Sequence, residues 1–226
     1  MAKSGAPARL KVINLFGGPG RGKSTVRAGL FWLMKTHGFS VEEVPEYAKS
    51  LVLQGNTWQL QEEQLFIFAQ QHHPQLLVAR NGYDYAVTDS PLHLCPFYAT
   101  LAPQHAYPEL EPLVDAAYAR HDNFNFFLTL EALDSAEQPD AFEARGRLQS
   151  AEQASQVERA LRQYLDGKGI ACIDMPVDRL TPWRILEHVA PGSVCWPQWP
   201  DDEALPPGHS RRNAALQTNA CKKVTQ

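Results

Sequence analysis

The sequence lacks an excess of positive charge. Its 21 lysine and arginine residues are outnumbered by 25 aspartates and glutamates, which gives the 226 residues a formal net charge of −4. The chain as a whole therefore exerts no basic field that would attract nucleic acid or an anionic membrane, although a local basic patch can still bind DNA. Charge alone only weakly disfavours a nucleic-acid substrate.

Long apolar runs and paired cysteines are missing as well. No run approaches the roughly 20 apolar residues that span a bilayer, and residues 1–11 contain no continuous apolar segment typical of a signal peptide. None of the cysteines stands at Cys-x-x-Cys spacing or in a His/Cys cluster, which argues against zinc. We expect a cytoplasmic protein with no membrane partner, whose thiols are reduced; they are Cys95, Cys172, Cys195 and Cys221.

What is present is an alternation of short apolar runs with amphipathic segments. Val26, Leu30 and Leu33, for example, recur at helical spacing. Strands that alternate with helices predict an α/β fold, with a parallel sheet and helices on both faces. We expect Pro74 to kink or break the longest helix. The predicted strands are 10–16, 39–44, 85–88, 123–130 and 170–175, and the predicted helices are 23–37, 58–80, 108–120, 151–165 and 182–189.

The composition changes near residue 191. Before that point the pattern predicts one domain over residues 1–190, a length that can bury a complete core. After it, proline, tryptophan and charged residues dominate, and we interpret 191–226 as a Pro/Trp-rich, partly disordered C-terminal tail. Trp196 and Trp199 indicate that the first part of this tail packs against something.

The strongest motif is residues 17–24, which match G-x-x-x-x-G-K-[ST] in full, after a predicted strand and before a predicted helix. Glycines allow the loop to point successive N–H groups at phosphate oxygens, and the following helix directs its positive end at the same anion. This P-loop predicts ATP with Mg²⁺: Lys23 reaches the β- and γ-phosphates and Ser24 is a magnesium ligand. The predicted nucleotide-binding residues are Gly17, Gly18, Pro19, Gly20, Arg21, Gly22, Lys23, Ser24 and Thr25, where Arg21 either contacts phosphate or is solvated.

Two carboxylates follow predicted strands. Asp89 ends the run 85–88, where ligands bind in open α/β sheets, so we expect it to hold Mg²⁺; otherwise it caps a turn before Pro91. A serine, Ser90, stands where a hydrolytic motor usually carries glutamate, which favours transfer to another acceptor. Glu46 follows the second strand and is a candidate general base for an attacking hydroxyl, unless it only begins a helix.

Three further groups are candidates for the acceptor side. Trp58 could stack on a base and Gln70 or Gln71 could bind its edge. Residues 134–150 are polar and resemble the short lid of small kinases, in which Arg145 and Arg147 would neutralise the transferred phosphoryl group; a solvated loop is the alternative. Arg120 is a weaker candidate for the same task.

These motifs together resemble a known family. FGGPGRGKST, VEEVPEYAK, QLFIFAQQ, YAVTDSP and ARGRLQSAEQA are similar to phage-encoded P-loop proteins, often called AAA-family ATPases, that lie close to nucleoside, nucleotide and nicotinamide riboside kinases. The resemblance covers about residues 10–175. It implies a P-loop kinase-like three-layer sandwich with a five-stranded parallel sheet and a short lid, and, for a phage protein, the host cytoplasm as location.

Within that group the chain most resembles the 5-hydroxymethyluridine DNA kinases. The resemblance implies a phosphotransferase that moves the γ-phosphate of ATP to the base's hydroxymethyl group in DNA, as a step in thymidine hypermodification. The catalytic set would be Lys23, Glu46, Asp89, Arg145 and Arg147. Two alternatives stay open: a kinase of a free nucleoside, nucleotide or related small molecule, and an ATP-hydrolysing regulatory or DNA-associated module.

Overall fold

A five-stranded parallel sheet forms the centre of the molecule. The computed structural model describes residues 9–129 and 151–197. The strand order is β2-β3-β1-β4-β5, and every neighbouring pair is parallel. The α/β fold with a five-stranded parallel sheet is therefore confirmed. The strands are β1 (Lys11–Phe16), β2 (Val41–Val44), β3 (Tyr85–Thr88), β4 (Asp122–Thr129) and β5 (Ile173–Pro176).

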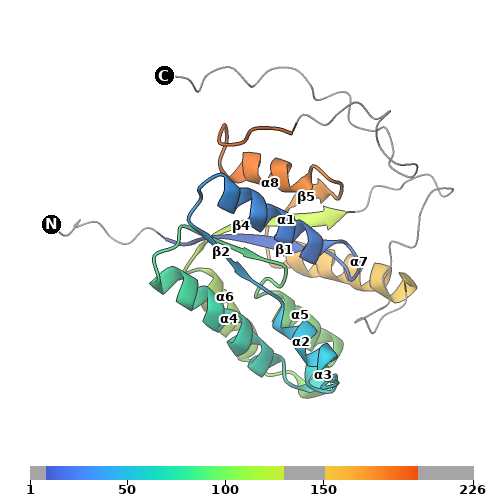
Figure 1. Cartoon of the computed structure of the whole chain (residues 1–226). Helices are drawn as coiled ribbons and strands as arrows, with labels where there is room; N and C mark the ends of the chain where they lie inside the picture. Colours follow the sequence, from blue (N-terminus) through green and yellow to red (C-terminus); the bar gives the residue numbers. More distant parts are fainter. Residues whose placement is uncertain (1–8, 130–150, 198–226) are drawn as a thin grey trace, which may run out of the picture.

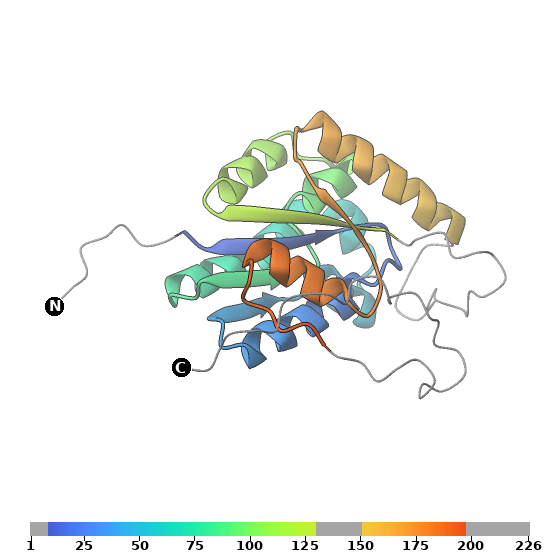
Figure 2. The same cartoon turned by 90° about the horizontal axis from the view of Figure 1, so that it is seen from above.

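Helices cover both faces of the sheet (Figures 1 and 2). One face packs against α1 (Lys23–Thr36) and α8 (Thr181–Val189), where Ile13 and Leu15 meet Leu30 and Ile185. Because side chains alternate along a strand, Val12 and Phe16 point to the other face. The helices that pack on that side are α4 (Gln64–Arg80), α5 (Leu94–Leu101), α6 (Leu110–Tyr118) and α7 (Ala151–Gly167).

The segment predicted as one helix over 58–80 differs from that prediction. It forms a short α3 (Gln59–Glu62) and a longer α4, and the break falls at Glu63, whose φ and ψ are −121° and 45°. Pro74 lies inside α4 without ending it, so the expected break there was wrong. Proline cannot donate to the carbonyl four residues earlier, but Gln70 at that position is exposed, so water can satisfy the carbonyl.

Three helical segments were missing from the predicted elements: α2 (Tyr47–Leu53), α5, and a 3₁₀ turn at Pro103–His105. The start of α2 agrees with the alternative interpretation of Glu46 as the residue that begins a helix, because Glu46 is its N-cap. The buried residues of α5 are the consecutive run 94–97 and Ala99, so its sequence shows no apolar stripe at helical spacing from which a helix could be recognised. The C-terminal end of β2 continues directly into α2, and β3 leads to α5 through residues 89–93. Both unpredicted helices therefore begin at the carboxyl edge of the sheet, where β1 leads into the P-loop.

Candidate active site

The P-loop connects β1 to α1 with the backbone that its glycines predict. Gly20 and Gly22 have φ of 84° and 72°, a conformation that residues with a Cβ rarely adopt. Gly22 is the residue before α1, so the amides of the first helical turn face the space above the loop. Residues 19–25 line one cavity. The loop is thus formed as an anion-binding turn at the positive end of a helix.

Lys23 lies folded over this loop. Its Nζ donates to the carbonyl oxygens of Gly17 and Gly18, at 2.8 and 2.9 Å. The ammonium group is therefore already in place beside the loop amides, where a lysine can contact the terminal phosphates of a nucleotide. Ser24 is half-buried and Thr25 is exposed, and both line the cavity.

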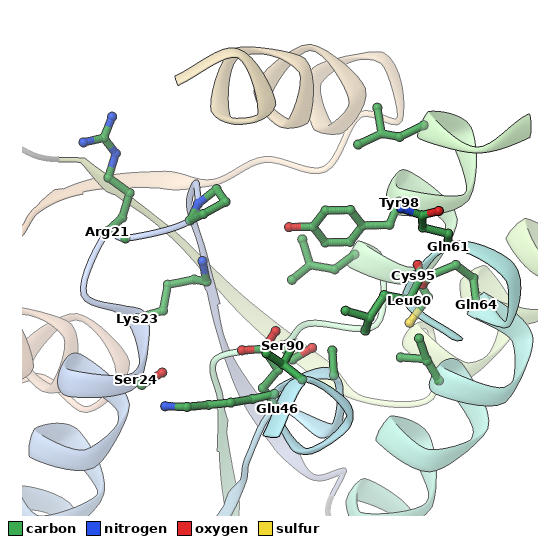
Figure 3. Close-up of a pocket in the computed structure, with 18 of the residues that line it drawn as sticks. Arg21, Lys23, Ser24, Glu46, Leu60, Gln61, Gln64, Ser90, Cys95 and Tyr98 are labelled. Atoms are coloured by element: carbon green, nitrogen blue, oxygen red, sulfur yellow. The ribbon is translucent and has the colours of Figure 1, made fainter. Parts of the chain in front are cut away.

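Arg21 is neither a solvated side chain nor directed at the phosphate space. Its guanidinium forms an ion pair with the carboxylate of Glu158 in α7. Figure 3 shows the side chain pointing away from Lys23 and Ser24. This partner could not be predicted from sequence, because it lies 137 positions away.

Asp89 follows β3 and is 2% exposed. The Nε atom of Arg27, on α1, lies 3.2 Å from its Oδ1. The two atoms form an ion pair, but neither makes a hydrogen bond among the described residues, so this buried oxygen still lacks a hydrogen-bond donor. Mg²⁺ or one of its water ligands would satisfy it, because magnesium prefers carboxylate and hydroxyl oxygens. Asp89 with the Ser24 hydroxyl therefore fits the predicted magnesium site.

Glu46 follows β2 and lines the same cavity as Lys23. The protein packed around it raises its pKa through burial; Lys23 opposes the shift, Asp89 adds to it, and Lys49 and Arg27 oppose it. Those influences place the carboxylate within electrostatic reach of the P-loop lysine and of Asp89. A carboxylate whose pKa is raised towards neutrality is better suited to accept a proton from a hydroxyl.

Gln71 hydrogen-bonds the backbone on both sides of Glu46. Its side-chain oxygen accepts from the backbone N–H of Tyr47 at 3.0 Å, and its nitrogen donates to the carbonyl of Pro45 at 3.2 Å and to Thr88. Gln71 is buried and does not line the cavity, so the prediction that it contacts substrate was wrong. Its position shows a structural role: it bonds the residues on both sides of Glu46.

The other two residues predicted to bind the acceptor, Trp58 and Gln70, do not line the cavity either. Trp58 is 53% exposed and lies at the start of α3, and Gln70 is on the solvent side of α4. Within α3 and α4, the glutamines that do line the cavity are Gln61 and Gln64; Gln104 and Gln153 line it from elsewhere in the chain. Gln64 and Gln71 share the buried face of α4 at helical spacing, and this stripe of amides was the signal that could have identified Gln64.

The cavity measures about 690 Å³ and runs from the P-loop to a wall built by α2, α3, α4 and α5. Figure 3 shows Lys23 and Ser24 on one side and Tyr98, Gln61 and Gln64 on the other, with Glu46 and Ser90 between them. Burial and the nearby Glu46 raise the pKa of Tyr98, which keeps its hydroxyl neutral. The remaining wall is largely apolar: Val52, Leu60, Ile67, Leu94, Cys95 and Leu101.

Arg120 was wrongly placed near this site. It precedes β4, whereas the P-loop follows β1, so it lies at the opposite edge of the parallel sheet. Arg145, Arg147 and the predicted lid over 134–150 lie outside the described residues. Within the parts that are described, no three His, Cys, Asp or Glu side chains gather as a metal site, and no helix has the length and apolarity needed to cross a membrane.

Comparison with protein families gives a match over residues 12–181, to a family described as AAA domain. The chain belongs to this AAA domain family. No curated protein matches the sequence.

Two kinases and NadR protein are among the solved structures similar to this AAA domain protein. Deoxyadenosine kinase from M. mycoides with bound dATP has a TM-score of 0.50 and 16% identity, over 79% of this chain and 98% of that chain. Thymidylate kinase from Ehrlichia chaffeensis has a TM-score of 0.52 and 13% identity, over 81% and 97%.

NadR protein in complex with NR has a TM-score of 0.53 and 15% identity over 79% of this chain, which spans about half of the NadR chain (51%). At such identities the likeness shows the fold alone. It confirms the predicted P-loop kinase-like layers around a parallel sheet.

Proposed function

We propose that this protein is a kinase that binds ATP with Mg²⁺ at the P-loop and transfers the γ-phosphate to a hydroxyl group of a nucleoside-class acceptor. One observation carries the proposal: Lys23 and Glu46 line a single cavity that continues, past Glu46, into a chamber walled by α2 to α5. A phosphate donor and a hydroxyl acceptor bound at its two ends would meet beside a carboxylate.

The transfer follows from the placement of these groups. Glu46 takes the proton of the acceptor hydroxyl, whose oxygen attacks the γ-phosphorus as the bond to the β-phosphate oxygen breaks and ADP leaves. Lys23 offsets the charge on the phosphates. Ser24 and Asp89 would hold Mg²⁺, which supplies further positive charge to the β- and γ-phosphate oxygens.

The wall suits a group with polar edges and a flat apolar body. Gln61, Gln64 and Tyr98 offer hydrogen bonds between apolar side chains. The side-chain nitrogen of Gln64 donates to the Leu60 carbonyl. The side-chain oxygen of Gln64 is therefore the atom left to accept a hydrogen bond from an N–H group of the bound acceptor. A pyrimidine or purine base combines an N–H donor with a flat ring.

Two acceptors are supported by different observations. The resemblance of the motifs to 5-hydroxymethyluridine DNA kinases favours the hydroxymethyl group of 5-hydroxymethyluracil in DNA, flipped into the chamber. The walled chamber and the net charge of −4 favour a free nucleoside. Ser90 lines the cavity after Asp89, where a water-activating glutamate would be needed for an ATP-driven module, which weighs against that third function.

The test is transfer of the γ-phosphate from labelled ATP with Mg²⁺. Hydroxymethyluracil-containing DNA, unmodified DNA and a panel of nucleosides and nucleotides are offered in parallel, with Lys23→Ala as the inactive control. Label on hydroxymethylated DNA alone supports the DNA acceptor, and label on a nucleoside alone supports the free acceptor. Release of free phosphate with no labelled acceptor would contradict the kinase proposal.

A further inference from the structure

The P-loop contains a second cation that the proposed transfer does not use. Arg21 stands two positions before Lys23 and lines the same cavity, yet its guanidinium points away from the phosphate space and pairs with Glu158. The two side chains are 23% and 19% exposed, so water screens the pair less than it screens a surface ion pair. A planar guanidinium is also the cation best matched to phosphate oxygens.

Helix α7 packs closely against the P-loop at Gly18. A Cβ atom added to Gly18 would lie 2.8 Å from the Cβ of Glu158 and 3.2 Å from the carbonyl oxygen of Ala154. Such distances require the neighbours to move, so only glycine fits at this position. The backbone of α7 at Glu158 therefore packs directly against the loop, which keeps the Glu158 carboxylate close to Arg21.

We propose that Glu158 sets the nucleotide affinity of the P-loop by holding Arg21 away from the bound phosphates. The loop binds phosphate through its amides, the α1 N-terminus and Lys23. The Arg21 guanidinium, turned onto the same anion as a second cation beside Lys23, would tighten the binding of ADP as well as ATP, because both carry phosphates at the loop. Tight binding of the product slows its release, which limits turnover in many kinases. The Arg21–Glu158 ion pair keeps the affinity for ATP and ADP lower than it would be if Arg21 also contacted the phosphates.

This inference rests on the nucleotide site of the proposed function and not on the acceptor. The measurement is the equilibrium dissociation constant of ADP and of a non-hydrolysable ATP analogue. Glu158→Gln keeps the shape of the side chain, removes the charge and releases Arg21, and we expect both constants to fall about fivefold, a difference of about 1 kcal/mol. The gain should shrink as salt is raised, because it is electrostatic. Asp166→Asn, an exposed change of the same charge at the far end of α7, should give less than a twofold effect.

The second arm repeats Glu158→Gln in an Arg21→Ala background. Without the guanidinium there is nothing to release, so we expect the effect of Glu158→Gln to fall below twofold. A gain that persists in this background would show that Glu158 only repels phosphate, and it would overturn the proposal. Weaker nucleotide binding in Glu158→Gln would also overturn it, because the pair would then be needed to shape the loop.

The outcome is separable from that of the proposed function. If the affinities change as expected but no acceptor is phosphorylated, the kinase proposal fails and the role of Glu158 stands. If Lys23→Ala leaves nucleotide binding unchanged, the P-loop is not the nucleotide site and both proposals fail. Melting curves of each variant establish that the compared proteins are folded.

Discussion

Replacing Glu46 by Gln tests the proposed chemistry most directly. Glutamine has nearly the same shape and can still accept a hydrogen bond, but it cannot take a proton. General-base catalysis typically contributes about 10²–10⁴-fold, or roughly 3–5 kcal/mol of barrier at 1.36 kcal/mol per tenfold. We therefore expect the turnover number to fall by at least about 10²-fold. Nucleotide affinity should stay within a few-fold of wild type, because Glu46 faces the acceptor side of the P-loop.

The pH dependence adds a second readout with a definite sign. Burial raises the pKa of Glu46 above its ordinary 4.5, so activity should fall as the pH drops through that raised value. Lys49 is one of the charges that lower this pKa. Lys49→Met should therefore move the acid limb of the profile to higher pH, and Glu46→Gln should abolish that limb.

Stability should change in the opposite direction to activity. The pKa of Glu46 is higher in the folded protein than in the unfolded chain, so folding is penalised once the group ionises. This penalty is absent below the unfolded pKa, grows between the unfolded and the folded pKa, and is complete above the folded pKa. Glu46→Gln should thus unfold at higher denaturant than wild type at pH 8, and the difference should vanish near pH 4.

The assay is initial-rate transfer from labelled ATP across pH, alongside urea unfolding at both pH values. Glu42→Gln is the matched control, since Glu42 lies on β2, the strand that Glu46 follows, pairs with Lys35 and does not line the cavity. Unchanged turnover in Glu46→Gln would refute the reasoning and remove Glu46 from the mechanism. An equal loss in both variants would show that the effect is structural.

Three other substitutions test the surrounding framework. Gln71→Leu leaves the Pro45 carbonyl and the Tyr47 N–H without their partner; it should cost about 1–3 kcal/mol in chemical unfolding and lower turnover more than nucleotide affinity. Asp89→Asn should raise the Mg²⁺ concentration for half-maximal activity about tenfold, measured by magnesium titration at fixed ATP, and no change would contradict its role as a ligand. Leu30→Ala empties a site that is 0% exposed under the sheet and should destabilise by about 2–5 kcal/mol, with the affinity for nucleotide retained in the folded fraction.

The phosphate side of the site could be predicted from sequence because its information is local. Gly20, Gly22 and Lys23 belong to one turn, whose backbone conformation and positive helix end follow from the residues themselves. Glu46 and Asp89 could be placed because both follow strands, and the carboxyl ends of parallel strands meet at one edge. The sheet itself was predictable from its apolar runs.

The acceptor side could not be predicted in the same way. Tyr98 comes from α5, whose buried residues 94–97 and 99 do not recur at helical spacing. Gln64 lines the cavity from the first turn of α4, whose start at the break after α3 was not predicted. Gln70 and Gln71 were predicted from residue type, but only the rotation of α4 decides which amide faces the cavity. Likewise, the Arg21–Glu158 pair depends on how α7 docks, which no short-range pattern records.

The P-loop is one local turn, whereas the acceptor wall is assembled from several helices, and this difference bears on how specificity for the acceptor is determined. In the proposed function the nucleotide is held by one continuous segment, residues 17–25, whose glycines cannot change without strain or steric conflict with α7. The acceptor wall is assembled from side chains of four short helices, among them Gln61, Gln64 and Tyr98. The P-loop is a separate segment from these wall helices, so under the proposed function we expect a few substitutions at Gln61 or Gln64 to alter the choice of acceptor while nucleotide binding is retained. The likeness to deoxyadenosine and thymidylate kinases is one of fold, and under the proposed function the choice of acceptor follows from the wall.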